Sequence, residues 1–300
     1  MTSVLITGAS GFVGENLAHR FRREGCELAL THCSTAPRAA ADRHFRVDLS
    51  RPGDFTRALG DFRADAVVHT AALINPDFCE RNPEQAWAVN AGGAGEVSRW
   101  AESRGARMIY FSTDLVYDGE GGPNAEDDRP GPLNVYGKTK LQGEEEVRGN
   151  CSDWVVVRLA LSYGPVRGHR GEWTAGMRKA LAAGKNLTLY TDQIRTPAYV
   201  GDTVEAVCRF ARSRCRGVFN LGGSESLSRY AFGLKFARVF GLPAERFLPI
   251  RMADLPTEAP RPRDCSLDTG KILKEIGLKT CDAEQGLRRQ QEEEKAMASG

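Results

Sequence analysis

The segment NVYGKTKLQGE, residues 134–144, places a tyrosine and a lysine four positions apart. On a helix, side chains at positions i and i+4 share one face, so Tyr136 and Lys140 would be neighbours. A nearby ammonium stabilises phenolate and lowers a tyrosine pKa from its usual value of about 10. The spacing favours a phenol that transfers a proton near neutral pH, against the alternative of an ordinary polar helix surface.

Two further observations favour chemistry at this helix. The chain uses arginine far more than lysine, yet position 140 is a lysine, whose compact ammonium differs from a planar guanidinium. Upstream, the apolar run RMIYFST ends in Thr113, whose hydroxyl is placed to hold a substrate carbonyl oxygen beside the phenol. Ligands of open α/β sheets bind at the carboxyl ends of strands, and Thr113 falls at such an end.

A glycine-rich loop, TGASGFVG, occupies residues 7–14 and spaces Gly8, Gly11 and Gly14 as G-x-x-G-x-x-G. Glycine triplets are common in a chain this rich in glycine, so context matters. The loop follows an apolar run and opens a helical pattern, as a dinucleotide-binding fingerprint requires. Bare backbone and a helix N-terminus would then approach a pyrophosphate. A tight turn without ligand is the alternative.

The residues beyond this loop bear on the choice between NADP and NAD. An acid about 20 residues after the glycines is typical of NAD-binding folds, but LTHCST contains none. Ser34 and Arg38 are instead placed to meet a 2′-phosphate, which slightly favours NADP over NAD. Asp48 is a candidate for the adenine amino group, with a turn residue as the alternative.

Short apolar runs alternate with helical patterns and would position these residues. The expected strands are 3–8, 26–31, 44–50, 64–72, 107–113, 154–164 and 216–223. The expected helices are 15–24, 83–105, 133–147 and 177–185, with a charged helix from 284 that ends in a frayed tail. Near-continuous apolar strands separated by helices predict a doubly wound parallel sheet, the Rossmann architecture, with a smaller C-terminal α/β substrate lobe.

The predicted domain boundaries follow this pattern. Residues 1–157, joined by about 200–223, would form the dinucleotide-binding Rossmann domain. Residues 158–199 and 224–290 would form the substrate-binding lobe, and 291–300 a tail.

Composition excludes several classes. A net charge of +2 gives no basic field for nucleic acid, and no apolar run approaches the roughly 20 residues of a membrane span. The opening residues lack a basic leader, so we expect no secretory signal. Eight cysteines without a C-x-x-C pair favour reduced thiols in the cytoplasm over disulfides or zinc, and we predict no metal site.

Together, TGASGFVG, STDLVYDG and PLNVYGKTKLQGE resemble the extended short-chain dehydrogenases/reductases, and most closely the dTDP-4-dehydrorhamnose reductase branch. RVDLS, DAVVHTAA, NPEQAWAVNA and DQIRTPAYVGD extend the resemblance over about residues 3–210, and it thins towards the C-terminus. It implies catalytic roles for Thr113, Tyr136 and Lys140, and a supporting role for Asn90. The residues expected at the cofactor are Gly8, Ser10, Gly11, Phe12, Val13, Gly14, Ser34, Arg38, Asp48, Leu49, Thr70, Ala71, Ala72, Asn90, Tyr136 and Lys140.

The resemblance also separates reaction types. Nucleotide-sugar dehydratases of this superfamily carry Thr-Asp-Glu where this chain reads Thr113-Asp114-Leu115, so elimination is not expected. The rhamnose-pathway reductases carry R-T-S-W-V-Y after the sixth strand, with a tryptophan against the sugar. This chain has Leu161 there, so that surface is missing or comes from another residue such as Trp173.

We therefore expect an NAD(P)H-dependent reductase of a keto group, with nucleotide-activated 4-keto-6-deoxysugars as substrates and with association as a homodimer. One alternative is a dinucleotide-binding regulatory protein like the regulatory subunit of methionine adenosyltransferase, and another is a nucleotide-sugar 4-epimerase. The residues expected to line the substrate site between the two lobes are Asn75, Asp114, Leu161, Arg170, Trp173, Arg195 and Tyr199.

Overall fold

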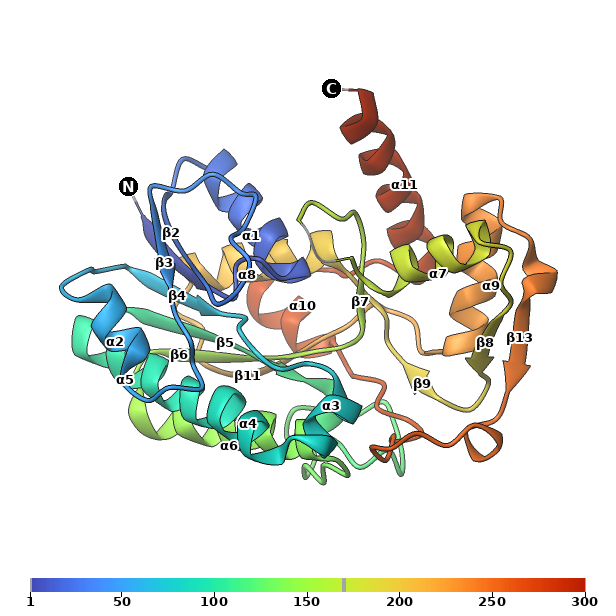
Figure 1. Cartoon of the computed structure of the whole chain (residues 1–300), viewed down its shortest axis with the longest axis horizontal. Coiled ribbons are helices and arrows are strands. Elements are labelled where there is room, and N and C mark those ends of the chain that lie inside the picture. Colours follow the sequence, from blue (N-terminus) through green and yellow to red (C-terminus); the bar gives the residue numbers. More distant parts are fainter. Residues whose placement is uncertain (1, 169–170, 300) are drawn as a thin grey trace.

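The computed structural model describes residues 2–168 and 171–299. Within them a seven-stranded sheet runs parallel throughout (Figure 1). Its strands, in spatial order, are β11 (Gly217–Leu221), β6 (Trp154–Leu159), β5 (Arg107–Thr113), β4 (Ala66–His69), β1 (Ser3–Thr7), β2 (Glu27–His32) and β3 (Arg43–Arg46). The chain leaves β1 in opposite directions along the sheet, so β1 and β4 flank the switch point where doubly wound folds bind ligands. The predicted fold class is confirmed.

The inner strands are apolar because helices cover both faces of the sheet. Every residue of β4 and β5 is buried, whereas the edge strand β3 is largely exposed. The register sets Leu5 beside Val67 on one neighbour and Ala29 on the other. Each of the seven strands overlaps a predicted strand, although β3 ends at Arg46 and β6 at Leu159, short of the predicted ends at 50 and 164.

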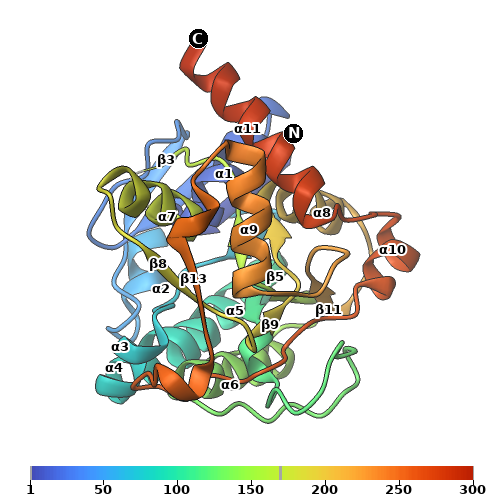
Figure 2. The same cartoon turned by 90° about the vertical axis from the view of Figure 1, so that its right-hand side faces the viewer.

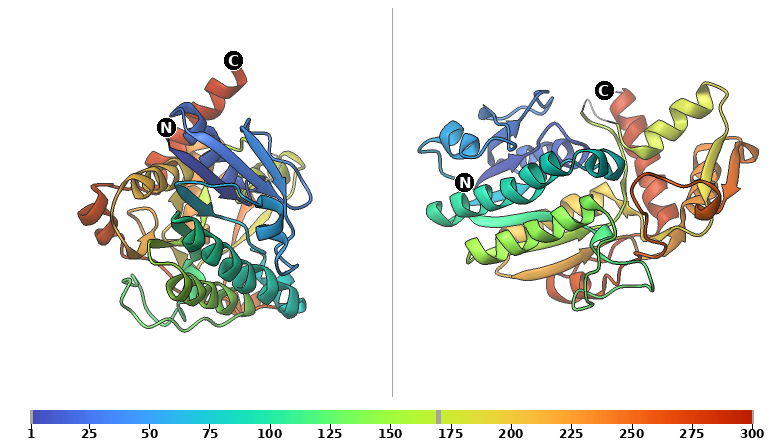
Figure 3. Two further views of the ribbon diagram at one scale, coloured as in Figure 1. Left: turned by 90° about the vertical axis from the view of Figure 1, so that its left-hand side faces the viewer. Right: turned by 60° about the horizontal axis from the view of Figure 1, so that its bottom comes forward.

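Two helical layers enclose the sheet (Figures 1 and 3). One face packs against α1 (Phe12–Arg23), α8 (Val200–Arg212) and α10 (Gly270–Ile276). The other packs against α2 (Asp54–Leu59), α5 (Gly93–Arg104) and α6 (Val135–Asn150), and α5 and α6 lie side by side in the right-hand view of Figure 3. The short helices α3 (Pro76–Arg81) and α4 (Pro83–Ala86) lead into α5.

A smaller lobe lies beyond the carboxyl ends of the strands (Figure 2). Its helices are α7 (Trp173–Ala182), α9 (Arg229–Phe240) and α11 (Ala283–Ser299). Its short strands are β7 (Ser162–Tyr163), β8 (Leu187–Tyr190), β9 (Ile194–Arg195), β10 (Ala198–Tyr199), β12 (Leu227–Ser228) and β13 (Phe247–Ile250). A separate apolar core containing Tyr163, Phe232 and Phe236 holds this lobe together, as the predicted second lobe requires.

Three element predictions need correction. Helix α10 was expected in the lobe, but Ile272 packs into the core beneath the large sheet. Residues 291–299 form no tail, because α11 continues as helix to Ser299, held in part by Arg178 against Glu294. The expected helix over 83–105 is interrupted by a π-helical turn, η1 (Trp87–Gly92), a feature often found at functional sites.

Candidate active site

Helix α6 carries the tyrosine–lysine pair at the carboxyl edge of β5. Its N-cap, Asn134, accepts a hydrogen bond from the Gly137 N–H (2.9 Å) and donates one to the Pro260 carbonyl (2.9 Å). A side chain at Gly137 would collide with the Leu115 carbonyl, so glycine lets the helix start press against the residues after Thr113. Tyr136 therefore lies in the first turn of α6, facing the end of β5.

The Tyr136 phenol is buried among apolar side chains, with Cys79 and Ala86 in the same cluster. Burial raises the pKa of Tyr136 above its usual range, and hydrogen bonding with Thr113 acts in the opposite direction. The spacing predicts that Lys140 lowers this pKa, but the structure gives the opposite shift, because desolvation is the largest effect on the phenol and the charge of Asp114 adds to it. The phenol is therefore protonated at neutral pH, the form that donates a proton.

Lys140 is buried one turn further along α6, with 2% of its surface exposed. Its ammonium lies 4.1 Å from the centroid of the Tyr110 ring. Burial lowers the pKa of Lys140 to about 7, and Glu144 opposes this shift only in part. Glu144 is already committed to a buried ion pair with Arg158 (2.8 Å). Lys140 is thus a partly neutral amine near pH 7 in this structure, which explains why it does not acidify the phenol.

Asn90, in the π-helical turn, ties the loop after β4 to helix α6. Its amide oxygen accepts from the Leu73 N–H (2.8 Å), and its nitrogen donates to the Leu73 carbonyl (3.1 Å) and the Thr139 hydroxyl (3.0 Å). Asn90 is fully buried. It supports the site by fixing α6 rather than by reaching into it.

The glycine loop is a tight strand-to-helix turn closed by the Gly11 N–H on the Gly8 carbonyl (2.9 Å). Gly8 has φ +64°, and a Cβ there would lie 2.6 Å from the Ala71 Cα at the end of β4. A Cβ on Gly14 would lie 2.6 Å from the Gly8 carbonyl oxygen. Helix α1 begins at Phe12 without a side-chain cap, so its first N–H groups suit a pyrophosphate. This cradle fits a dinucleotide.

The loop after β2 is held next to this cradle. The buried Glu15 carboxylate on α1 accepts from the backbone N–H groups of Arg38 (2.6 Å) and Ala39 (3.0 Å). Ser34 and Arg38 are both exposed there, where an adenosine ribose would lie in this fold. Asp48 is engaged in a turn, accepting from Ser50 (2.6 Å), so its predicted adenine contact would have to compete with that bond.

The other predicted cofactor residues surround the switch point. Thr70 donates to the Thr7 carbonyl (2.6 Å), and the Ala71 N–H donates to the Thr7 hydroxyl (3.3 Å), which joins the ends of β1 and β4. Ser10, Phe12 and Val13 lie in or directly after the glycine loop, Ala72 follows Ala71, and Leu49 packs against Gly93 of α5.

Several predicted substrate residues come together beside Thr113. The Thr113 hydroxyl donates to Asp114 (3.2 Å), and Asp114 forms a buried ion pair with Arg195 of β9 (3.3 Å). Burial raises the pKa of Asp114, and Arg195 lowers it. The Trp173 indole donates to the Ser162 carbonyl (3.1 Å). This tryptophan therefore lies close to Leu161, the residue before Ser162.

Other predicted contacts are used elsewhere or cannot be placed. Asn75 caps α3 by accepting from the Phe78 N–H (3.0 Å). Tyr199 is 3% exposed and donates to Glu293 of α11, so it packs the lobe rather than facing Thr113. Arg170 lies outside the described residues. Arg229, which the sequence did not single out, instead lies over Trp173 (4.1 Å).

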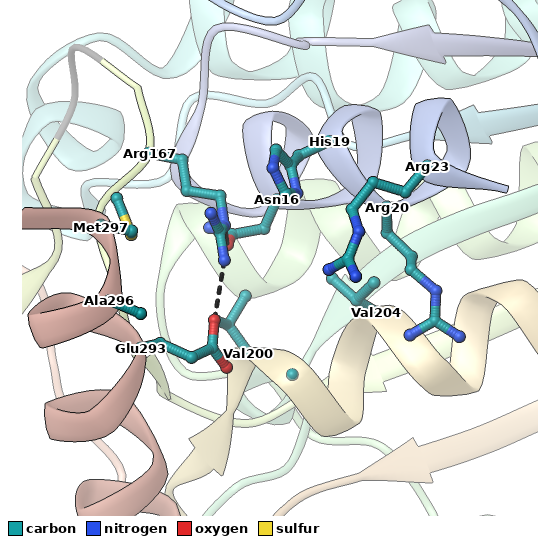
Figure 4. Close-up of a pocket in the computed structure, with 11 residues that line it drawn as sticks. Asn16, His19, Arg20, Arg23, Arg167, Val200, Val204, Glu293, Ala296 and Met297 are labelled. Atoms are coloured by element: carbon teal, nitrogen blue, oxygen red, sulfur yellow. Dashed lines mark hydrogen bonds and ion pairs between the residues drawn. The ribbon is translucent and has the colours of Figure 1, made fainter. Parts of the chain in front are cut away.

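A surface pocket of about 410 Å³ lies elsewhere, between α1, α8 and α11 (Figure 4). Its basic side chains are largely paired, since Arg167 binds Glu293 (2.7 Å) and Arg20 binds Glu205 (2.8 Å). None of the three predicted catalytic residues lines it. We therefore place the site at the sheet edge and not in this pocket.

Across residues 2–168 and 171–299, no group of three or more His, Cys, Asp or Glu side chains is arranged to hold a metal ion. Within the same ranges, every helix is too short or too polar to cross a bilayer.

Comparison with known proteins identifies close relatives along nearly the whole chain. Residues 1–295 match the family described as RmlD substrate binding domain, well beyond the resemblance to residue 210. The probable low-salt glycan biosynthesis reductase Agl14 of Haloferax volcanii is 32% identical over 279 residues, covering 91% of each chain. Methionine adenosyltransferase 2 subunit beta of Rattus norvegicus is 33% identical over 288 residues, covering 92% of this chain and 82% of the relative.

Solved structures show the same fold. The dTDP-4-dehydrorhamnose reductase of Clostridium acetobutylicum superposes with a TM-score of 0.86 at 25% identity, covering 97% of this chain and 98% of the other. The enzyme of that name from Bacillus anthracis, in complex with NADP, gives 0.85 at 24% identity, with 97% and 99% covered. The chain thus belongs to the RmlD substrate binding domain family, the branch that its sequence motifs predicted.

Proposed function

We propose that this protein is an NAD(P)H-dependent reductase that converts a keto group of a nucleotide-activated sugar to an alcohol. The observation that carries the proposal is one connected set of contacts. Gly8 packs on Ala71, in the loop after β4. Leu73 of that loop is hydrogen-bonded to Asn90, and Asn90 is hydrogen-bonded to Thr139, which lies between the two predicted catalytic residues of α6. The dinucleotide cradle and the phenol are therefore parts of one rigid arrangement.

Each catalytic residue has a distinct task in this proposal. The nicotinamide, when bound, supplies the hydride to the carbonyl carbon. Thr113 donates a hydrogen bond to the carbonyl oxygen and orients it. Tyr136 gives its proton to that oxygen as negative charge develops there, which a raised pKa permits because the phenol is fully protonated beforehand. Lys140 binds the cofactor ribose, and the restored charge of its amine stabilises the phenolate left behind.

The dinucleotide is held by the glycine loop and the start of α1, with Arg38 available for a 2′-phosphate. This arrangement favours NADP over NAD. The absence of a glutamate after Asp114 favours reduction over elimination.

Leu161 replaces the expected tryptophan, so the sugar differs from that of the rhamnose-pathway enzymes or meets Trp173 instead. The Agl14 relative is named a glycan biosynthesis reductase, which supports sugar reduction without fixing the sugar. Association as a homodimer stays a prediction.

A second function has a specific observation in its favour. Regulatory subunits of methionine adenosyltransferase are as similar in sequence as the reductase relative. A regulatory protein needs the dinucleotide cradle but not a buried, hydrogen-bonded phenol next to a buried amine. The Thr113–Tyr136–Lys140 set therefore favours the enzyme.

One experiment separates the two functions. Purified protein is mixed with NADPH or NADH and a panel of dTDP- and UDP-linked 4-keto-6-deoxysugars, and absorbance at the nicotinamide band is followed. The reductase proposal predicts substrate-dependent oxidation with at least one sugar. Tight dinucleotide binding without turnover on any of them would favour the regulatory function. Nicotinamide cofactor retained through purification would instead indicate an epimerase.

A further inference from the structure

Arg229 occupies a position between the lobe and the catalytic strand. It is the first residue of α9, directly after β12, and β12 pairs with β9 so that Leu227 lies opposite Arg195. Its guanidinium carbon lies 4.1 Å from the centroid of the Trp173 ring. The charges of Arg195 and Asp114 both act on it. Three elements that are distant in sequence thus meet at this side chain.

Neither carboxylate of this cluster is paired directly with Arg229. Asp114 is already paired with Arg195 at 3.3 Å. The nearby Glu172 caps α7, accepting from the backbone N–H groups of Thr174 (2.7 Å) and Ala175 (2.9 Å). Within residues 2–168 and 171–299, the Arg229 guanidinium makes no hydrogen bond or ion pair. Among the described residues it is thus a cation without a direct carboxylate contact, although the charges of Asp114 and Glu172 act on it.

The electrostatics agree with this geometry. Burial, followed by repulsion from Arg195, lowers the pKa of Arg229 to about 10. An arginine with a satisfied carboxylate partner shows the opposite shift, as Arg158 does beside Glu144. At neutral pH Arg229 is nevertheless charged, and no carboxylate of the described residues contacts its guanidinium directly.

The stacking geometry leaves Arg229 able to bind. A guanidinium that rests with its face on an aromatic ring keeps its in-plane N–H donors available. Those donors match the planar or tetrahedral oxygens of a carboxylate or phosphate. The indole also restricts the long side chain, which reduces the entropy lost when a ligand binds.

Contacts lead from this cation to the reacting group. Arg195, the neighbour of Arg229, pairs with Asp114, and Asp114 accepts from the Thr113 hydroxyl (3.2 Å). Thr113 in turn lies close enough to the Tyr136 phenol to lower its pKa. An anionic group of a substrate whose carbonyl lies at Thr113 would therefore reach Arg229 within the dimensions of one sugar nucleotide.

We propose that Arg229 binds an oxyanion of the substrate, either its diphosphate or a carboxylate on its sugar, and so determines which nucleotide sugars the site accepts. This inference rests on the proposed function, because it assumes that nucleotide sugars bind at Thr113. It assigns a binding role to a residue without any part in the hydride or proton transfer.

The test measures binding rather than turnover. Dissociation constants of dTDP, UDP, UDP-glucose, UDP-glucuronic acid and thymidine are measured by calorimetry on the NADPH-saturated full chain. The test variants are Arg229→Gln and Arg229→Lys. The matched control is Arg214→Gln, because Arg214 is an exposed arginine just before β11, an edge strand of the large sheet. NADPH affinity and the melting temperature of each variant report on folding.

We expect Arg229→Gln to weaken binding of anionic probes about 10- to 100-fold, the usual loss for a charge-assisted hydrogen bond, with thymidine and NADPH unchanged. Arg229→Lys should recover part of the affinity and Arg214→Gln should behave as wild type. If Arg229→Gln loses affinity for every diphosphate probe, Arg229 binds the diphosphate. If it loses affinity for UDP-glucuronic acid alone, Arg229 binds the carboxylate.

Equal binding of all probes by wild type and Arg229→Gln would overturn the inference, as would failure of wild type to bind any of them. Failure of the proposed function has a different signature. In that case the protein binds the probes through Arg229 but oxidises no NADPH with any keto sugar.

Discussion

The Lys140 ammonium lies 4.1 Å from the centre of the Tyr110 ring, and the Tyr110 hydroxyl donates back to the Lys140 carbonyl (3.2 Å). The aromatic face stabilises the cation, but burial still lowers the pKa of Lys140 to about 7. A buried amine held in this way is poised to regain its charge when an anionic cofactor arrives. This relationship gives the first prediction.

Without added cofactor, stability should increase from pH 7 to pH 9. The folded-state pKa of Lys140 is about 7 and its ordinary value is 10.5, so the unfolded chain binds more protons between these limits. The cost of burying the amine is greatest below pH 7 and disappears as the pH approaches 10.5. Urea unfolding at both pH values should show an increase on the order of 2 kcal/mol larger for wild type than for Lys140→Met. Parallel pH profiles would contradict this.

We expect an alanine to be tolerated less well at Gly8 than at Gly25. Both have positive φ, +64° and +73°, but only Gly8 faces a backbone atom, the Ala71 Cα, where a Cβ would lie. Gly25→Ala should cost only the left-handed strain of about 1–2 kcal/mol. Gly8→Ala should cost more and should weaken NADPH binding at least tenfold. Fluorescence titration with NADPH measures this, and equal affinity in both variants would refute the cradle.

Asn90 should act through the position of α6. Asn90→Leu leaves the Leu73 N–H without its buried acceptor, and we expect a loss of about 2–4 kcal/mol in the free energy of unfolding. Thr139→Ser keeps a hydroxyl for Asn90 and should cost less than about 1 kcal/mol. Denaturant unfolding of the two variants makes the comparison. An undisturbed Asn90→Leu protein would mean that these bonds do not hold the helix.

Arg38 should discriminate NADPH from NADH. If its guanidinium meets the 2′-phosphate, Arg38→Gln weakens NADPH binding about 10- to 100-fold and leaves NADH binding unchanged. Arg43→Gln, an exposed arginine at the start of β3, is the control. Direct binding titrations with both dinucleotides decide the matter. An equal effect on both would remove the case for NADP.

Much of this architecture could be predicted from local sequence. The inner strands are apolar runs because both faces of the sheet are covered, and the glycine loop follows from its place between the first strand and helix. Tyr136 and Lys140 share a helical face in the structure as their spacing requires. The periodicity of apolar residues and the spacing of the motif residues indicate these features directly.

What the sequence could not predict depends on tertiary burial. The pKa of Tyr136 is raised, and not lowered as the spacing predicted, because an apolar cluster surrounds the phenol. That cluster comes from α3, α4 and the residues after β5. Helix α10 returns to the sheet from a distant part of the chain. Arg229 carries no motif, since an arginine after an N-cap serine is ordinary, and only the pairing of β12 with β9 brings it to Trp173.

The central claim is that the Tyr136 proton reaches the carbonyl oxygen of a bound keto sugar. The most direct measurement is single-turnover NADPH oxidation by Tyr136→Phe, with the sugar that wild type reduces fastest. We predict NADPH and sugar affinities within about twofold of wild type, and a rate lower by about 10²- to 10⁴-fold, the usual contribution of a positioned acid. A Tyr136→Phe protein that turns over at nearly the wild-type rate would contradict the account.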